Sequence, residues 1–114
     1  MGFHSEVSMT WEVRYTEEAK NDFAALDGSQ KILVKKAIEK VQQNPLPNTE
    51  GGYGKPLSNY NNSKLAGLLK IKLKNAGIRI VYNLVRVDSK MVIIIIGARA
   101  DNEVYKLAEA RFKK

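Results

Sequence analysis

Alternating apolar and polar residues mark the first regular element of the chain. From Thr10 to Tyr15 every second side chain is apolar or aromatic, at Trp11, Val13 and Tyr15. Successive side chains of a strand point to opposite faces, so this alternation predicts a strand with one buried face. The pattern then changes to a spacing of three and four residues, which is typical of helices.

Two consecutive helices are predicted after this strand. Their apolar stripes are Ala19, Phe23 and Leu26 in the first helix and Val34, Ala37, Ile38 and Val41 in the second. Thr16 and Ser29 are the expected N-caps, because a hydroxyl can accept a hydrogen bond from a backbone N–H of the first turn. Pro45 stops the second helix, since proline cannot donate a backbone hydrogen bond. We expect the two helices to form a hairpin that covers one face of a sheet.

Three further strands follow a long polar loop that runs from Asn44 to Lys64. They are expected at residues 65–73, 78–87 and 91–98. The short turns between them predict antiparallel pairing. The run from Met91 to Ile96 does not alternate, and this favours a central strand that is buried on both faces.

A last helix is expected after these strands, with Asp101 as its N-cap. Its apolar stripe is Val104, Leu107, Ala108 and Phe112. The order of elements predicts an α+β fold: a small, mostly antiparallel four-stranded sheet with the N-terminal helical hairpin on one face and a C-terminal helix. A chain of 114 residues is long enough for one domain with its own core. We assign residues 9–114 to this domain and interpret Met1 to Ser8 as a leader or a disordered extension.

Positive charge is concentrated in one quarter of the chain. The formal net charge is +7 at pH 7. Residues 64–90 contain seven lysines and arginines and one acid, for a net charge of +6, whereas residues 1–63 have a net charge of −1. This concentration is typical of a binding face for a polyanion and not of charge that is spread evenly for solubility.

Three basic residues of this region are expected on one face of two neighbouring strands. Lys70 and Lys72 have the same parity, and the apolar residues between and beside them must face the helical hairpin. Arg79 of the next strand can lie beside the lysines across the turn. These residues alone leave two interpretations open, a solvated sheet face or a site for RNA or another polyanion.

The residues that the chain lacks exclude several chemistries. It has no cysteine, and therefore no disulfide, thiolate metal site or thiol nucleophile. Its single histidine, His4, lies in the expected leader, and no cluster of Asp, Glu and His has metal-ligand spacing. We therefore expect no metal and no cofactor. The longest apolar run, Met91 to Gly97, is too short to cross a bilayer, so a cytoplasmic protein without a membrane partner is expected.

Four short motifs combine the basic residues with a tyrosine. They are Lys70-Ile71-Lys72-Leu73, Gly77 to Tyr82, Gly97-Ala98-Arg99 and Glu103-Val104-Tyr105. Together they resemble the RelE-type toxins of bacterial toxin–antitoxin systems, in the RelE/ParE superfamily. The similarity covers about Met9 to Lys113, and the family has the order of elements predicted above. Ala98 and Asp101 depart from it, because RelE-like sequences often carry basic residues there.

The resemblance implies an endoribonuclease that cuts messenger RNA in the 30S A site of the ribosome and so inhibits translation. The catalytic residues that it implies are Lys70, Lys72, Arg79, Arg99 and Tyr105. We expect further basic residues to contact RNA or the ribosome, namely Lys64, Lys74, Arg86, Lys90 and Arg111. The family also implies a cognate antitoxin of the RelB type, which would cover the basic face with an acidic helix or segment.

The reaction that this set implies is a metal-independent transesterification. The 2′-hydroxyl of one nucleotide attacks its own 3′-phosphate and leaves a 2′,3′-cyclic phosphate and a 5′-hydroxyl. Lys72 is the first candidate for the base, and Tyr105 is the alternative. Lys70 and Arg79 would stabilise the phosphorane, while Arg99 would hold the phosphate or assist the leaving oxygen.

Two other functions stay open from the sequence. ParE-like toxins share the fold and inhibit DNA gyrase without cutting RNA. A non-catalytic RNA-binding module would use the same five residues only to hold phosphate.

Overall fold

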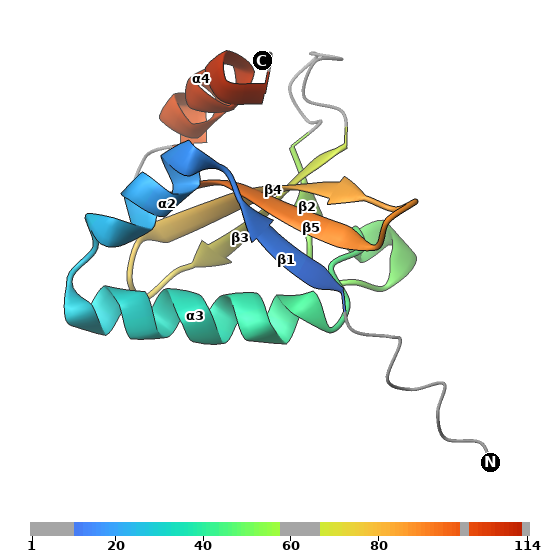
Figure 1. Ribbon diagram of the computed structural model, residues 1–114, viewed down its shortest axis with the longest axis horizontal. Helices are drawn as coiled ribbons and strands as arrows, with labels where there is room; N and C mark the ends of the chain where they lie inside the picture. Colours follow the sequence, from blue (N-terminus) through green and yellow to red (C-terminus); the bar gives the residue numbers. More distant parts are fainter. Residues whose placement is uncertain (1–10, 58–66, 99–100, 113–114) are drawn as a thin grey trace.

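The computed structural model describes residues 11–57, 67–98 and 101–112 (Figure 1). The elements in chain order are β1 (Glu12–Tyr15), α2 (Glu17–Ala24), α3 (Gly28–Gln42), the 3-10 turn η1 (Asn48–Glu50), β2 (Lys55–Pro56), β3 (Leu68–Leu73), β4 (Ile78–Val85), β5 (Lys90–Gly97) and α4 (Asp101–Phe112). No helix among these elements is long and apolar enough to cross a membrane.

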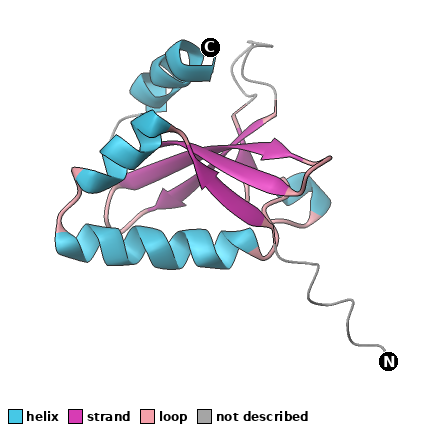
Figure 2. Ribbon diagram, viewed as in Figure 1, coloured by secondary structure: helices cyan, strands magenta, loops and turns pink. Residues whose placement is uncertain are grey.

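The strands, magenta in Figure 2, form one sheet. Their order is β1-β5-β4-β3-β2. β1 pairs with β5 in parallel, and the other neighbours pair antiparallel. The predicted α+β fold with a mostly antiparallel sheet is confirmed. The prediction of four strands missed β2, which pairs Lys55 with Lys70 and Pro56 with Leu69. A strand of two residues is too short to show a period of its own.

Helices cover both faces of this sheet. Figure 1 shows α3 along one side and α4 on the other. The first face packs against α2 and α3 and contributes, among others, Leu69, Ile80 and Tyr82 to one core cluster. The second face lies under α4, where Leu68 and Val81 belong to a separate cluster. Residues of opposite parity on the same strands therefore enter different cores, as the alternation of a strand requires.

β5 is buried on both faces, as the sequence predicted. Ile93, Ile94, Ile95 and Ile96 are each at most 4% exposed. The register with β4 shifts beside this run, so that Ile95 lies opposite Val81 and Ile93 opposite Tyr82. This irregularity places Ile94 and Ile95 together in the core under α4, while Ile93 and Ile96 enter the core of the helical hairpin.

The starts of α2 and α3 confirm one predicted cap and correct the other, and α4 begins at Asp101, which was expected as the cap before it. The hydroxyl of Thr16 accepts a hydrogen bond from the Ala19 N–H at 3.1 Å. The cap of α3 is Asp27 and not Ser29. Asp27 accepts from the Gln30 N–H at 2.8 Å, and the Gln30 side chain accepts from the Asp27 N–H at 3.0 Å. This reciprocal capping box satisfies two backbone donors, which a serine two positions later cannot do.

The first part of the predicted long loop is folded onto the sheet. The Tyr82 hydroxyl donates to the Pro45 carbonyl at 2.6 Å, and Arg86 binds Glu50 through the two terminal nitrogens of its guanidinium at 2.9 and 2.6 Å. Gly52 approaches the backbone of Leu46 so closely that a Cβ there would lie 2.1 Å from the Leu46 carbonyl oxygen. Residues 44–57 are thus held against β4 by side chains that come from the strand and its end.

Candidate active site

Lys70 and Lys72 point to the α4 face of the sheet. Leu69, between Leu68 and Lys70, belongs to the core of α2 and α3, whereas Leu68 has the parity of the lysines and belongs to the core under α4. Ile71 packs with Leu69 against the helical hairpin. The predicted division, apolar residues toward the hairpin and lysines away from it, is confirmed.

Lys72 and Arg79 are direct partners across the β3–β4 pair. Side chains of such partners lie on the same face, with Cβ atoms about 4.5–5.5 Å apart. A groove of about 220 Å³ follows them to the end of the sheet, and Lys74 is a third basic residue on its wall. Two like charges placed opposite each other destabilise a strand pair. An anion bound between Lys72 and Arg79 would relieve that repulsion.

Lys70 is buried against Tyr105 of α4. Its ammonium donates to the Tyr105 hydroxyl at 3.3 Å and lies 5.4 Å from the centre of the ring. Both residues are only 8% exposed. A lysine this deeply buried is uncommon, because removing the ammonium from water is costly unless other groups compensate. The contact brings a cation and a hydroxyl from elements 35 residues apart in the chain next to the Lys72–Arg79 pair, since Lys70 and Lys72 share one face of β3.

Two of the predicted site residues lie outside the described residues: Arg99 of the catalytic set and Lys64 of the RNA-contact set. Gly97, the last residue of β5, is the cross-strand partner of Arg79. Arg99 follows Gly97 by two positions in the sequence. Its assignment to the site stays a prediction.

Arg86 and Lys90 lie at the opposite end of the sheet. Arg79 is the second residue of β4, and Val85, the last one, pairs with Lys90, so Arg86 and Lys90 are about 20 Å from Arg79 at the rise of a strand. Arg86 is bound to Glu50, which raises the pKa of the Arg86 guanidinium and holds the pKa of the Glu50 carboxyl below its ordinary value. The structure therefore separates these two residues from the candidate site, and any RNA contact that they make is a distant one.

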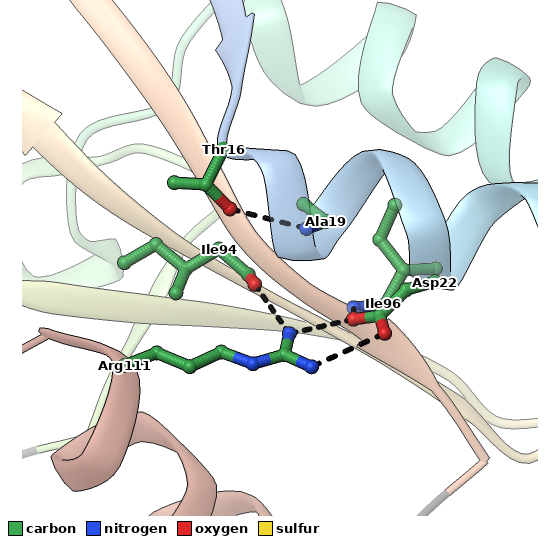
Figure 3. A network of polar contacts seen from close by, with 6 residues as sticks. All are labelled: Thr16, Ala19, Asp22, Ile94, Ile96 and Arg111. Carbon is green, nitrogen blue, oxygen red and sulfur yellow. Dashed lines mark hydrogen bonds and ion pairs between the residues drawn. The ribbon is translucent and has the colours of Figure 1, made fainter.

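Arg111 is a structural residue. Its guanidinium donates to both carboxylate oxygens of Asp22, at 2.7 and 3.3 Å, and to the Ile94 carbonyl at 2.8 Å (Figure 3). The Arg111 and Asp22 side chains are 14% and 12% exposed. Two of its guanidinium nitrogens are engaged inside the protein, and an RNA contact of Arg111 stays a prediction. Asp22 was not singled out from the sequence at all.

The described part of the site offers cations and a hydroxyl. Lys70, Lys72 and Arg79 can stabilise negative charge on a phosphate, and Tyr105 can bond to a sugar hydroxyl or stack on a base. Among the described residues no group of three His, Cys, Asp or Glu side chains is placed to hold a metal ion. The arrangement suits phosphate chemistry in which the nucleophile belongs to the ligand.

No family model matches the chain. A curated RelE-like toxin protein of Escherichia coli is 27% identical over 109 residues, which is 92% of this chain and 100% of that protein. The free state of a double arginine mutant of E. coli RelE matches 90% of this chain and 98% of its own with a TM-score of 0.70, at 23% identity. The chain has a RelE-like fold and is similar in sequence to a RelE-like toxin protein. The resemblance to RelE-type toxins, predicted from the four motifs, is confirmed.

The RelE-like fold also matches toxin chains solved in complexes. The intact E. coli RelBE toxin–antitoxin complex matches with a TM-score of 0.60 at 21% identity, over 79% of this chain and 98% of that chain. The toxin–antitoxin complex RelBE2 of Mycobacterium tuberculosis matches with a TM-score of 0.62 at 24% identity, over 79% and 99%. At these identities the likeness to the solved structures establishes the fold.

Proposed function

We propose that this RelE-like chain is a metal-independent endoribonuclease that cuts messenger RNA and acts as the toxin of a toxin–antitoxin pair. The observation that carries the proposal is the convergence of Lys70, Lys72, Arg79 and Tyr105 on one face of the sheet. The likeness to RelE supports it. Ribosome-bound messenger RNA in the 30S A site is the substrate, and the cytoplasm is where the protein meets it.

The proposed reaction is an in-line transesterification. The 2′-oxygen of one nucleotide forms a bond to its own 3′-phosphorus, and the bond from that phosphorus to the 5′-oxygen of the next nucleotide breaks. Lys72 takes the proton of the 2′-hydroxyl, and Tyr105 is the alternative base. Lys70 and Arg79 stabilise the charge of the phosphorane, while Arg99 assists the leaving oxygen, which is protonated to a 5′-hydroxyl.

An antitoxin that covers this face is the proposed partner. Solved relatives of the fold include RelE and RelB bound to each other. The net charge of +6 on residues 64–90 of this chain favours an acidic helix or extended segment as the part that docks. Such a segment would inhibit the enzyme by occupying the cationic face that the RNA needs.

Mapping of cleaved ends tests the activity. The purified protein is added to ribosomes engaged on a defined messenger RNA, and the products are mapped by primer extension and by the chemistry of their ends. We expect cuts with 2′,3′-cyclic phosphate and 5′-hydroxyl ends. Arg79→Ala and Arg99→Ala should each lower the rate on the order of 10² to 10³-fold, as loss of a preorganised donor does. Lys36→Ala, an exposed site on α3, is the matched control and should leave the rate unchanged.

Lys72→Arg tests the base more narrowly, because the charge is kept and proton acceptance is nearly lost. Undiminished cleavage in this variant would remove Lys72 as the base. Salt-dependent RNA binding without any cut would favour the binding module, and inhibition of DNA gyrase without RNA ends would favour the ParE-like function.

A further inference from the structure

The ion pair between Asp22 and Arg111 joins three elements at one point. Asp22 lies on α2, Arg111 on α4, and the backbone that both contact belongs to β5 (Figure 3). The Asp22 carboxylate accepts from the Ile96 N–H at 3.0 Å as well as from Arg111. Arg111 in turn donates to the Ile94 carbonyl. Each charge is thus satisfied by its partner and by the strand.

The position of this pair is explained by where β1 ends. β1 pairs with β5 only as far as Tyr15 and Ile93. Beyond that point the edge of β5 continues without β1, and its buried backbone groups need other partners. Asp22 supplies an acceptor to Ile96 and Arg111 a donor to Ile94. The two side chains therefore bond to the edge of β5 where the neighbouring strand is missing.

The same pair connects α2 and β5 to the helix that carries Tyr105. Val104, Ala108 and Arg111 recur at the spacing of one helix face, and the first two are buried in the core under α4. Arg111 follows Tyr105 by six residues, about 9 Å along the helix axis. Tyr105 also belongs to this core and Leu107 packs against it, so among the described residues the apolar core contacts of α4 end at Ala108. The Arg111 guanidinium, bonded at three points, joins the last turn of α4 to α2 and β5.

We propose that Asp22 and Arg111 are positioning residues: their ion pair holds α4 so that Tyr105 stays against Lys70. The part of this proposal that concerns rate rests on the proposed function, whereas the part that concerns the position of Tyr105 does not. Neither residue touches the RNA. Their effect reaches the reaction through the place of the Tyr105 hydroxyl, and a displacement of about 1 Å at a reacting group can cost on the order of 10²-fold in rate.

The variants are chosen to break the pair with little change of shape. Arg111→Met removes the guanidinium, and Asp22→Asn keeps an oxygen for the Ile96 N–H while removing the charge. Lys106→Met, exposed on the same helix, is the matched control for loss of one cation from α4. The full chain is used throughout, and circular dichroism shows that each variant is folded. If Arg111→Met does not fold, Asp22→Asn alone decides the outcome.

The position of Tyr105 is followed without any RNA. The ring signal of Tyr105 in protein with 13C-labelled tyrosine is assigned with Tyr105→Phe, and hydrogen exchange of the α4 amides is measured against those of α3. We expect both pair variants to move the Tyr105 signal and to speed exchange in α4 several-fold, while Lys106→Met does neither. A lowered melting temperature with an unmoved Tyr105 signal would mean a merely structural pair and would overturn the proposal.

Cleavage kinetics separate positioning from RNA contact. Both pair variants should lower kcat on the order of 10-fold or more with KM and its salt dependence nearly unchanged. If Arg111→Met raised KM and reduced the salt slope while Asp22→Asn had no effect, Arg111 would be a phosphate contact and the proposal would be wrong. A wild-type chain that does not cleave would overturn the proposed function, and the Tyr105 signal would still decide the role of the pair.

Discussion

Lys70 and Tyr105 bury each other: the ammonium lies 3.3 Å from the hydroxyl oxygen and 5.4 Å from the ring centre, with each residue 8% exposed. A sheet face under a helix is ordinarily filled by apolar side chains, as Leu68 and Val81 fill it here. Placing an ammonium there costs stability unless other groups compensate. Functional sites often retain such locally unfavourable choices, and this one lies at the centre of the proposed site.

Lys70→Met is expected to separate stability from activity. Methionine fills a similar volume without a charge, and replacing a buried charged residue by a well-packed apolar one is often neutral or stabilising. The melting temperature should therefore stay the same or rise, while cleavage falls on the order of 10² to 10³-fold. Thermal denaturation and the cleavage assay check the two parts. A strongly destabilised variant would show that Lys70 is held for the fold.

Tyr105→Phe tests the hydroxyl apart from the ring. Phenylalanine keeps the aromatic face beside the Lys70 ammonium and removes the acceptor of its hydrogen bond. Stability should fall by about 1 kcal/mol, which is the ordinary net value of one hydrogen bond. Cleavage should fall far more if the hydroxyl serves as base or holds the sugar, and should persist if the ring acts only by stacking. Denaturant unfolding and single-turnover cleavage measure these effects.

Gly52→Ala should destabilise the segment between α3 and β2. A Cβ at this position would lie 2.1 Å from the Leu46 oxygen and 2.6 Å from its carbonyl carbon, so the backbone must move. We expect a loss of about 1–3 kcal/mol, the usual cost of overpacking. Gly28→Ala is the matched control, because nothing lies within 4 Å of its Cβ. That change should be neutral or stabilise by roughly 0.5 kcal/mol. Equal effects of both changes in urea denaturation would contradict the close packing at Gly52.

Periodicity was sufficient to predict most of the fold, because both sheet faces are covered and each face imposes its own pattern. Lys70 and Lys72 alternate with Leu69 along the strand. From this alternation the sequence predicted that the lysines lie on the face away from the helical hairpin, as the structure shows. The short turn between the two strands also predicted that Arg79 lies beside the lysines, and the structure makes Lys72 its direct partner. What alternation cannot supply is β2, whose two residues are placed by pairing with β3 and have no pattern of their own.

The ion pair of Arg111 with Asp22 could not be predicted from charge alone. A basic residue in the last turn of a helix is usually solvated, and the sequence gives no sign that it meets a carboxylate 89 residues away. One signal was present: Arg111 continues the spacing of Val104 and Ala108, so it belongs to the buried stripe of α4. Asp22 likewise follows Ala19 by three residues in α2. Opposite charges on the buried sides of two helices predict an ion pair only if the two helices are known to lie close together, and the sequence does not show this for α2 and α4.

The ion pair between Glu50 and Arg86 predicts how stability changes in acid. The hydrogen bond from Arg86 holds the pKa of the Glu50 carboxyl below its ordinary value, so the native state favours the ionised form. The stabilisation from this carboxylate is complete above the pKa of an unfolded glutamate, about 4.3, and is lost as the pH falls through the lower native pKa. Glu50→Gln should therefore lower the melting temperature slightly at pH 7, and the difference from the wild type should close toward pH 3.

Glu39→Gln, which removes one carboxylate from the exposed surface of α3, corrects for the change in net charge. Because the pair is exposed, the effect should also shrink in high salt. A difference that widened on acidification would show that Glu50 contributes through something other than its charge.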